Sequence, residues 1–112
     1  MNFEHLLVIV KDGVATLTVN RPEKLNALND QVVTQLRLAA QLLKDDELVR
    51  GVILTGAGPK AFIAGADIGD LASQGVLEGR QRALAGQAVL RAFETMGKPV
   101  IAAVNGYALG GG

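Results

Sequence analysis

Two short segments rich in glycine and alanine carry the residues of this 112-residue chain that are best suited to chemistry. The first is AGAD at residues 64–67, and the second is GYALGGG at residues 106–112. Small side chains let a ligand come within hydrogen-bonding distance of backbone N–H groups. Two such groups aimed at one point stabilise a carbonyl oxygen as it gains negative charge. Taken alone, the spacing is more typical of glycines that only permit turns and close packing.

The composition argues against several other kinds of chemistry. Eleven basic and eleven acidic residues give a formal net charge of zero, so nothing electrostatic favours nucleic acid or an anionic membrane surface. The absence of cysteine excludes a disulfide scaffold, a thiolate zinc site and a cysteine nucleophile. No group of His, Asp and Glu has the spacing of metal ligands, so we expect no metal and no separate cofactor. No apolar run approaches the ~20 residues of a membrane span and no signal peptide is recognisable, so we expect a cytoplasmic protein.

Local patterns predict the elements that must position the two segments. Apolar runs at residues 5–10 and 14–19 flank Asp12-Gly13, and this arrangement is a strong signal for a β-hairpin. After an ordered loop at residues 20–28, helical periodicity begins near Asn29, which can cap the helix as Asp30 could.

The second half of the chain alternates between expected strands and helices. We expect strands at 52–55 and 100–104, both covered on two faces, and helices near 67–72 and 78–96. The resulting order, β-β-α-β-α-α-β, predicts an α/β protein with a right-handed crossover between the two later strands.

Three segments in succession resemble signatures of the enoyl-CoA hydratase/isomerase (crotonase) family. They are NRPEKLNAL at residues 20–28, KAFIAGADI at 60–68, and KPVIAAVNGYALGGG at 98–112. Their order and spacing match the N-terminal half of that family, and the resemblance covers essentially the whole chain. It implies a crotonase-like (ββα) spiral fold, of which residues 1–112 would form the N-terminal half.

The resemblance also implies the site. The backbone N–H groups of Ala66 and Gly111 would form an oxyanion hole for the thioester carbonyl of an acyl-CoA, with coenzyme A as part of the substrate. Ala64 and Ala66 would have to stay small so that the thioester can approach. The implied substrate-binding residues are Lys24, Leu25, Ala27, Ala64, Ala66, Asp67, Ile68, Tyr107, Leu109, Gly110 and Gly111. Gly69 departs from the family, because many relatives carry a polar or basic residue there.

The implied reaction is hydration of a trans-2-enoyl-CoA to a 3-hydroxyacyl-CoA, as in fatty acid β-oxidation, by a homotrimer or homohexamer. The two catalytic glutamates of family hydratases would follow the triple glycine, beyond residue 112. We therefore expect the 112-residue chain alone to be inactive. Acidic residues within the chain are not expected to replace these glutamates, because Glu23, Glu78 and Glu94 fall on solvated positions. Asp67 is expected to cap a helix or contact ligand.

Three alternatives remain open. Isomerases and other crotonase-family acyl-CoA enzymes share this half of the sequence, and a non-catalytic acyl-CoA-binding module would need nothing more. Separately, GAGPKA at residues 56–61 fits the dinucleotide-binding pattern G-x-G-x-x-G/A after an expected strand, although Pro59 argues against a helix starting there. His5, the only histidine, has no partners for a catalytic or metal-binding role.

Overall fold

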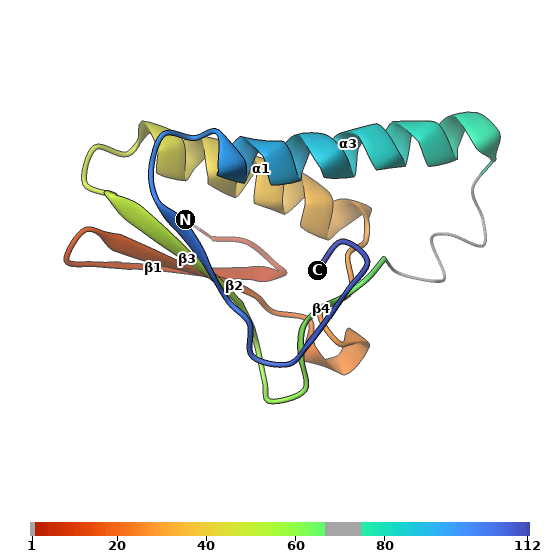
Figure 1. Ribbon diagram of the computed structural model, residues 1–112, viewed down its shortest axis with the longest axis horizontal. Coiled ribbons are helices and arrows are strands. Elements are labelled where there is room, and N and C mark those ends of the chain that lie inside the picture. Colours follow the sequence, from red (N-terminus) through yellow and green to blue (C-terminus); the bar gives the residue numbers. More distant parts are fainter. Residues whose placement is uncertain (1, 67–74) are drawn as a thin grey trace.

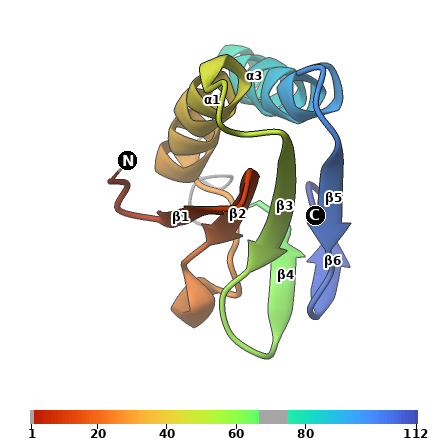
Figure 2. The ribbon, with the colours of Figure 1, turned by 90° about the vertical axis from the view of Figure 1, so that its left-hand side faces the viewer.

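A four-stranded sheet with two helices on one face forms most of the molecule. The structure is a computed structural model that describes residues 2–66 and 75–112. The sheet has the order β1-β2-β3-β5, with β1 antiparallel to β2 and the other neighbours parallel. In the described residues, helices α1 and α3 lie side by side on the same face of the sheet (Figures 1 and 2). The bounds of the four strands are Leu6–Lys11 for β1, Val14–Val19 for β2, Gly51–Gly56 for β3 and Val100–Ala103 for β5. The predicted α/β class is confirmed.

The hairpin at the start of the chain forms where the sequence predicts it. Asp12 and Gly13 both have positive φ, at 52° and 81°, which gives a tight turn that matches the twist of the strands. The pairing runs from Lys11 opposite Val14 to Leu6 opposite Val19. Alternation along β2 then directs Ala15, Leu17 and Val19 into the core, where all three are buried.

Helix α1, Asp30–Asp45, supplies the largest share of the helical side of the core. The side chain of Asn29 accepts a hydrogen bond of 2.9 Å from the N–H of Val32, so Asn29 is the N-cap and the expected helix start is confirmed. The residues that the helix buries against the sheet are Val32, Leu36, Ala39, Ala40 and Leu43.

Helix α3, Val76–Glu94, packs beside α1 and begins and ends two residues before the expected range. It buries Val89 and Phe93, whereas Ala85 of the expected apolar stripe is exposed. After the helix, the ammonium group of Lys98 donates hydrogen bonds of 2.7 Å to the carbonyls of Leu43 and Asp46. These bonds satisfy carbonyls at the end of α1 and fix where β5 begins.

A second sheet of two short parallel strands was not predicted. Strands β4, Ala61–Ala64, and β6, Tyr107–Leu109, pair with each other across more than forty residues of sequence. Runs of three and four residues rich in alanine carry no alternation, so no local pattern marks them as strands. A 3₁₀ turn, η1 (Pro22–Lys24), lies within the segment expected to be an ordered loop.

The expectation that residues 52–55 and 100–104 are covered on both faces is wrong for the described structure. β5 is the last strand in the sheet order, and Ile101 is 62% exposed. In β3, Ile53, Leu54 and Thr55 are only half-buried. The continuous apolar run in β5 thus faces solvent rather than a second layer of helices. The short helix expected near 67–72 lies outside the described residues.

Candidate active site

The pairing of β4 with β6 brings the two glycine-containing segments together (Figure 2). Ile63 lies opposite Ala108 and Ala64 opposite Leu109, after an irregularity in register near the start of β4. Just beyond the strands the two backbones almost touch, because a Cβ placed on Gly110 would lie 3.4 Å from the Cα of Gly65. Small residues here have a packing role, and that role also places the N–H groups of both segments in one small region.

The loop before α1 lies alongside β4 and is hydrogen-bonded to it and to the residue that follows it. Leu25 and Asn26 have left-handed backbones, with φ of 54° and 57°, which reverses the chain so that it runs along β4. The carbonyl of Leu25 accepts a hydrogen bond of 3.1 Å from the N–H of Ala64, and the N–H of Leu28 donates one of 2.8 Å to the carbonyl of Gly65. Leu28 also forms a parallel bridge with Ala66. The three segments that carry the family resemblance therefore meet in space.

Leu28 lies close to both residues that are expected to supply the oxyanion donors. Its backbone pairs with Ala66, and its Cδ1 atom lies 2.9 Å from the position of a Cβ added at Gly111. Among the described residues, neither the N–H of Ala66 nor that of Gly111 is bonded to a backbone carbonyl. Both residues are exposed.

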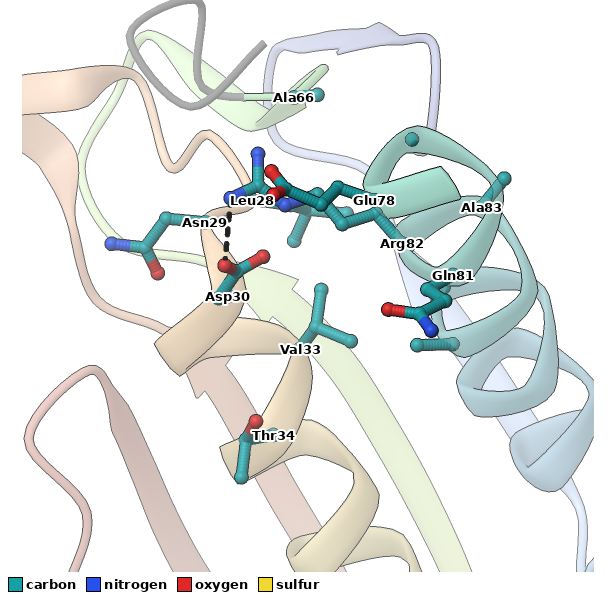
Figure 3. Close-up of a pocket in the computed structure, with 13 residues that line it drawn as sticks. Leu28, Asn29, Asp30, Val33, Thr34, Ala66, Glu78, Gln81, Arg82 and Ala83 are labelled. Carbon is teal, nitrogen blue, oxygen red and sulfur yellow. Dashed lines mark hydrogen bonds and ion pairs between the residues drawn. The ribbon is translucent and has the colours of Figure 1, made fainter. Parts of the chain in front are cut away.

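A cavity of about 690 Å³ opens beside Ala66, between the start of α1 and the first turns of α3 (Figure 3). Its volume is in the range of small-molecule binding sites. Asp30 and Arg82 form an ion pair of 3.0 Å that joins the two helices across this space. The lining consists of Leu28, Asn29, Asp30, Val33, Thr34, Ala66, Glu78, Gly79, Gln81, Arg82, Ala83, Ala85 and Gly86.

Among the expected substrate-binding residues that the structure describes, Ala66 is the one that lines this cavity. Leu25 lines a second cavity of about 210 Å³, next to the loop that joins β3 to β4. Ala27 and Ala64 are half-buried between the layers, whereas Lys24, Tyr107, Leu109, Gly110 and Gly111 are exposed. Asp67 and Ile68 lie outside the described residues.

Several residues near the site were not singled out by the sequence. Leu28 was part of the quoted loop but was not selected, and Asp30 and Arg82 are 52 positions apart, so no local pattern links them. Glu23, Glu78 and Glu94 are exposed, as expected, although Glu78 also contributes to the cavity lining. His5 contacts α1, since its Nε2 atom lies 2.9 Å from Oε1 of Gln31.

The dinucleotide-binding alternative does not fit the structure. The segment 56–61 connects β3 to β4, so its glycines lead into a strand and not into a helix. The pyrophosphate-binding pattern requires a helix N-terminus at that point.

Neither α1 nor α3, the helices of the described residues, has the length and apolar character of a membrane-spanning helix.

A sequence model described as enoyl-CoA hydratase/isomerase matches residues 10–112. The short-chain-enoyl-CoA hydratase of Clostridium acetobutylicum is 47% identical over 107 residues, which cover 95% of this chain and 41% of that protein. The crotonyl-CoA hydratase of Syntrophomonas wolfei is 43% identical over 112 residues, covering 100% of this chain and 43% of that protein.

A solved structure gives the same result for the fold. The enoyl-CoA hydratase from Bacillus anthracis superposes with a TM-score of 0.94 and 34% identity, over 97% of this chain and 43% of that one. The expected crotonase-like fold is confirmed. The chain spans about two fifths of the length of these relatives.

Replacement of Gly106 tests the close approach of β6 to β4. A Cβ at Gly106 would lie 2.2 Å from the carbonyl oxygen of Lys60, so Gly106→Ala must push the strands apart and weaken the Tyr107 N–H bond to that oxygen. We expect the free energy of unfolding, measured with urea, to fall by about 1–3 kcal/mol, as overpacking usually costs.

Gly86→Ala is the matched control. A Cβ at Gly86 meets nothing within 4 Å, and the residue lies inside α3, so alanine should raise stability by about 0.5–1 kcal/mol. Equal stability of Gly106→Ala and the unsubstituted protein would contradict the placement of β6 against β4.

Proposed function

The chain belongs to the enoyl-CoA hydratase/isomerase family, and from this premise we propose that it supplies the acyl-CoA-binding and oxyanion-hole part of a hydratase. The single observation that carries the proposal is the meeting of Ala66, Leu28 and Gly111 where β4 and β6 end. In the proposal, the N–H groups of Ala66 and Gly111 bind the same oxygen atom of the substrate. The activity of the whole protein is part of the proposal, because the chain spans only about two fifths of its relatives.

In the proposed mechanism, the thioester carbonyl oxygen of a trans-2-enoyl-CoA accepts hydrogen bonds from the N–H groups of Ala66 and Gly111. These bonds draw electron density from the conjugated double bond, so the carbon β to the carbonyl becomes electrophilic. Water gives up a proton to a base as its oxygen bonds to that carbon, and the electrons of the double bond pass to the carbonyl oxygen, which becomes the oxygen of an enolate. Protonation of the α-carbon then gives the 3-hydroxyacyl-CoA. Fixed donors stabilise the enolate more than the ground state, and that difference lowers the barrier.

The neighbouring surfaces fit the rest of such a substrate. The cavity beside Ala66 is large enough for a short acyl chain, and Leu28 and Val33 give it apolar walls. Lys24 and Leu25 are exposed in the loop before α1, and we place the coenzyme A portion beside them. We place the carboxylates that activate water and transfer the proton outside residues 1–112.

Isomerase activity is the second candidate, because it uses the same enolate stabilisation and differs in the proton-transferring groups. An isomerase would move a double bond without consuming water. Product analysis with a 3-enoyl-CoA and a 2-enoyl-CoA, offered separately, distinguishes the two reactions.

A chimera tests whether residues 1–112 supply substrate binding and the oxyanion hole while the rest of the domain supplies the proton-transferring groups. Residues 1–112 would be joined to the part of the Syntrophomonas wolfei crotonyl-CoA hydratase that lies outside its match to this chain. We expect the chimera to hydrate crotonyl-CoA, followed by loss of the enoyl absorbance, and the 112-residue chain alone to be no faster than buffer. Turnover by the chain alone would contradict the proposal, as would a folded chimera that binds no acyl-CoA.

Ala66→Pro in an active protein tests the first donor. Proline removes the N–H and nothing else polar, so kcat should fall by about 10²–10³, the usual cost of one oxyanion-hole donor. Ala66→Gly keeps the N–H and serves as the control, with most of the activity retained. Circular dichroism would verify the fold of both variants, and full activity of a folded Ala66→Pro protein would disprove the assignment.

A further inference from the structure

Two asparagine side chains from distant parts of the chain hold the same backbone carbonyl, that of Ala61. The Nδ2 atom of Asn26 lies 2.9 Å from this oxygen, and the Nδ2 atom of Asn105 lies 3.1 Å from it. Ala61 is the first residue of β4, the strand that leads to Ala66. Neither asparagine touches the candidate oxyanion donors themselves in any of the hydrogen bonds of the described residues.

The amide of Asn26 is fully buried and connects three segments. Its Oδ1 atom accepts a bond of 2.9 Å from the N–H of Arg21, and its two amide hydrogens go to the carbonyls of Ala57 and Ala61, at 3.0 and 2.9 Å. Both donors are therefore used, as buried polar groups require. Asn26 lies two residues before Leu28, which pairs with Ala66.

The amide of Asn105 also binds the loop that joins β3 to β4. Its Nδ2 atom lies 2.9 Å from the carbonyls of both Gly56 and Gly58, in addition to Ala61. Its Oδ1 atom accepts a bond of 3.1 Å from the N–H of Gly56. Asn105 lies two residues before β6, which leads to Gly111.

The backbone at Gly56, inside this arrangement, leaves no room for a side chain. A Cβ at Gly56 would lie 2.3 Å from the carbonyl oxygen of Phe62, 2.5 Å from that of Ala61 and 2.8 Å from Nδ2 of Asn26. The loop is thus pressed against β4 while both asparagines bind it. Any shift of one asparagine must move the start of β4 or break several hydrogen bonds.

We propose that Asn26 and Asn105 are positioning residues that act together through the carbonyl of Ala61 to set the relative position of the Ala66 and Gly111 N–H groups. Asn26 fixes the loop that pairs with Ala66, Asn105 fixes the start of β6, which leads to Gly111, and β4 lies between them. This inference rests on the proposed function, because it concerns the geometry of the oxyanion hole. Two donors can bind one oxygen atom only if each is held to within about 0.5 Å of its productive position.

The test measures polarisation of a bound thioester in the whole protein, so it does not depend on turnover. The probe is 2,4-hexadienoyl-CoA, whose conjugated chain absorbs at longer wavelength when hydrogen bonds draw charge toward its carbonyl oxygen. Asn105→Ala removes the amide, and Asn105→Asp keeps an acceptor for the Gly56 N–H but loses the donors. Because Asn105 is only half-buried, both variants should fold even if Asn26→Ala does not.

Lys98→Met is the matched control. It removes two hydrogen bonds of 2.7 Å to backbone carbonyls, but these lie at the end of α1 and before β5, away from the glycine segments. We expect it to lower the melting temperature and leave the wavelength shift of the bound probe unchanged. If the asparagines had a purely structural role, the Asn105 variants would likewise have a lower melting temperature and an unchanged wavelength shift.

In the two Asn105 variants, and in Asn26→Ala if it folds, we expect a wavelength shift at least about twofold smaller, since small misplacements weaken such alignment steeply. The dissociation constant of the probe should change less than the shift does. The double variant Asn26→Ala/Asn105→Ala should lose little more than the larger single loss, because both act through one carbonyl. An unchanged shift in folded Asn105 variants, or an equal loss in Lys98→Met, would overturn the inference. If the unsubstituted protein itself gave no shift, the proposed function would fail instead.

Discussion

Parallel pairing of β4 with β6 is the interaction on which the site depends. The two strands have four and three residues, and they join segments that are separated by α3 and β5. Their approach is so close that a Cβ at Gly106 or at Gly112 would collide with the backbone of Lys60 or Ile63. Glycine at these positions is therefore a steric requirement of the pairing.

A pair of such short strands has little stability of its own, so its position comes from the elements around it. Phe62 and Ile63 of β4 are buried with the core residues of the sheet and helices. The loop at residues 25–28 binds the far end of β4, and the amides of Asn26 and Asn105 bind its beginning. The four-stranded sheet and the two helices thus act as a rigid support, and the chemistry is placed on the small sheet beside it.

Local physics explains what could be predicted from the sequence. Asp12-Gly13 specifies its own turn, Asn29 caps the helix that follows it, and the periodic apolar residues of α1 define the face that packs. β4, β6 and the Asp30–Arg82 ion pair depend instead on residues 40 or more positions away, so no window of sequence contains their cause. Ala66 and Gly111 were selected through the family resemblance, and only the fold explains why they lie near each other. The exposed face of β5 was mispredicted because an apolar run indicates burial without specifying what provides it.

The central claim is that the N–H groups of Ala66 and Gly111 bind one oxygen atom, and a crystal structure with a bound thioester tests it most directly. Butyryl-CoA is suitable because it has no double bond to hydrate. The account predicts a thioester oxygen at about 2.7–3.1 Å from both nitrogen atoms, the distance expected of oxyanion donors. An ordered thioester whose oxygen bonds to neither N–H group, or to Ala66 alone while the Gly111 N–H points away, would contradict it.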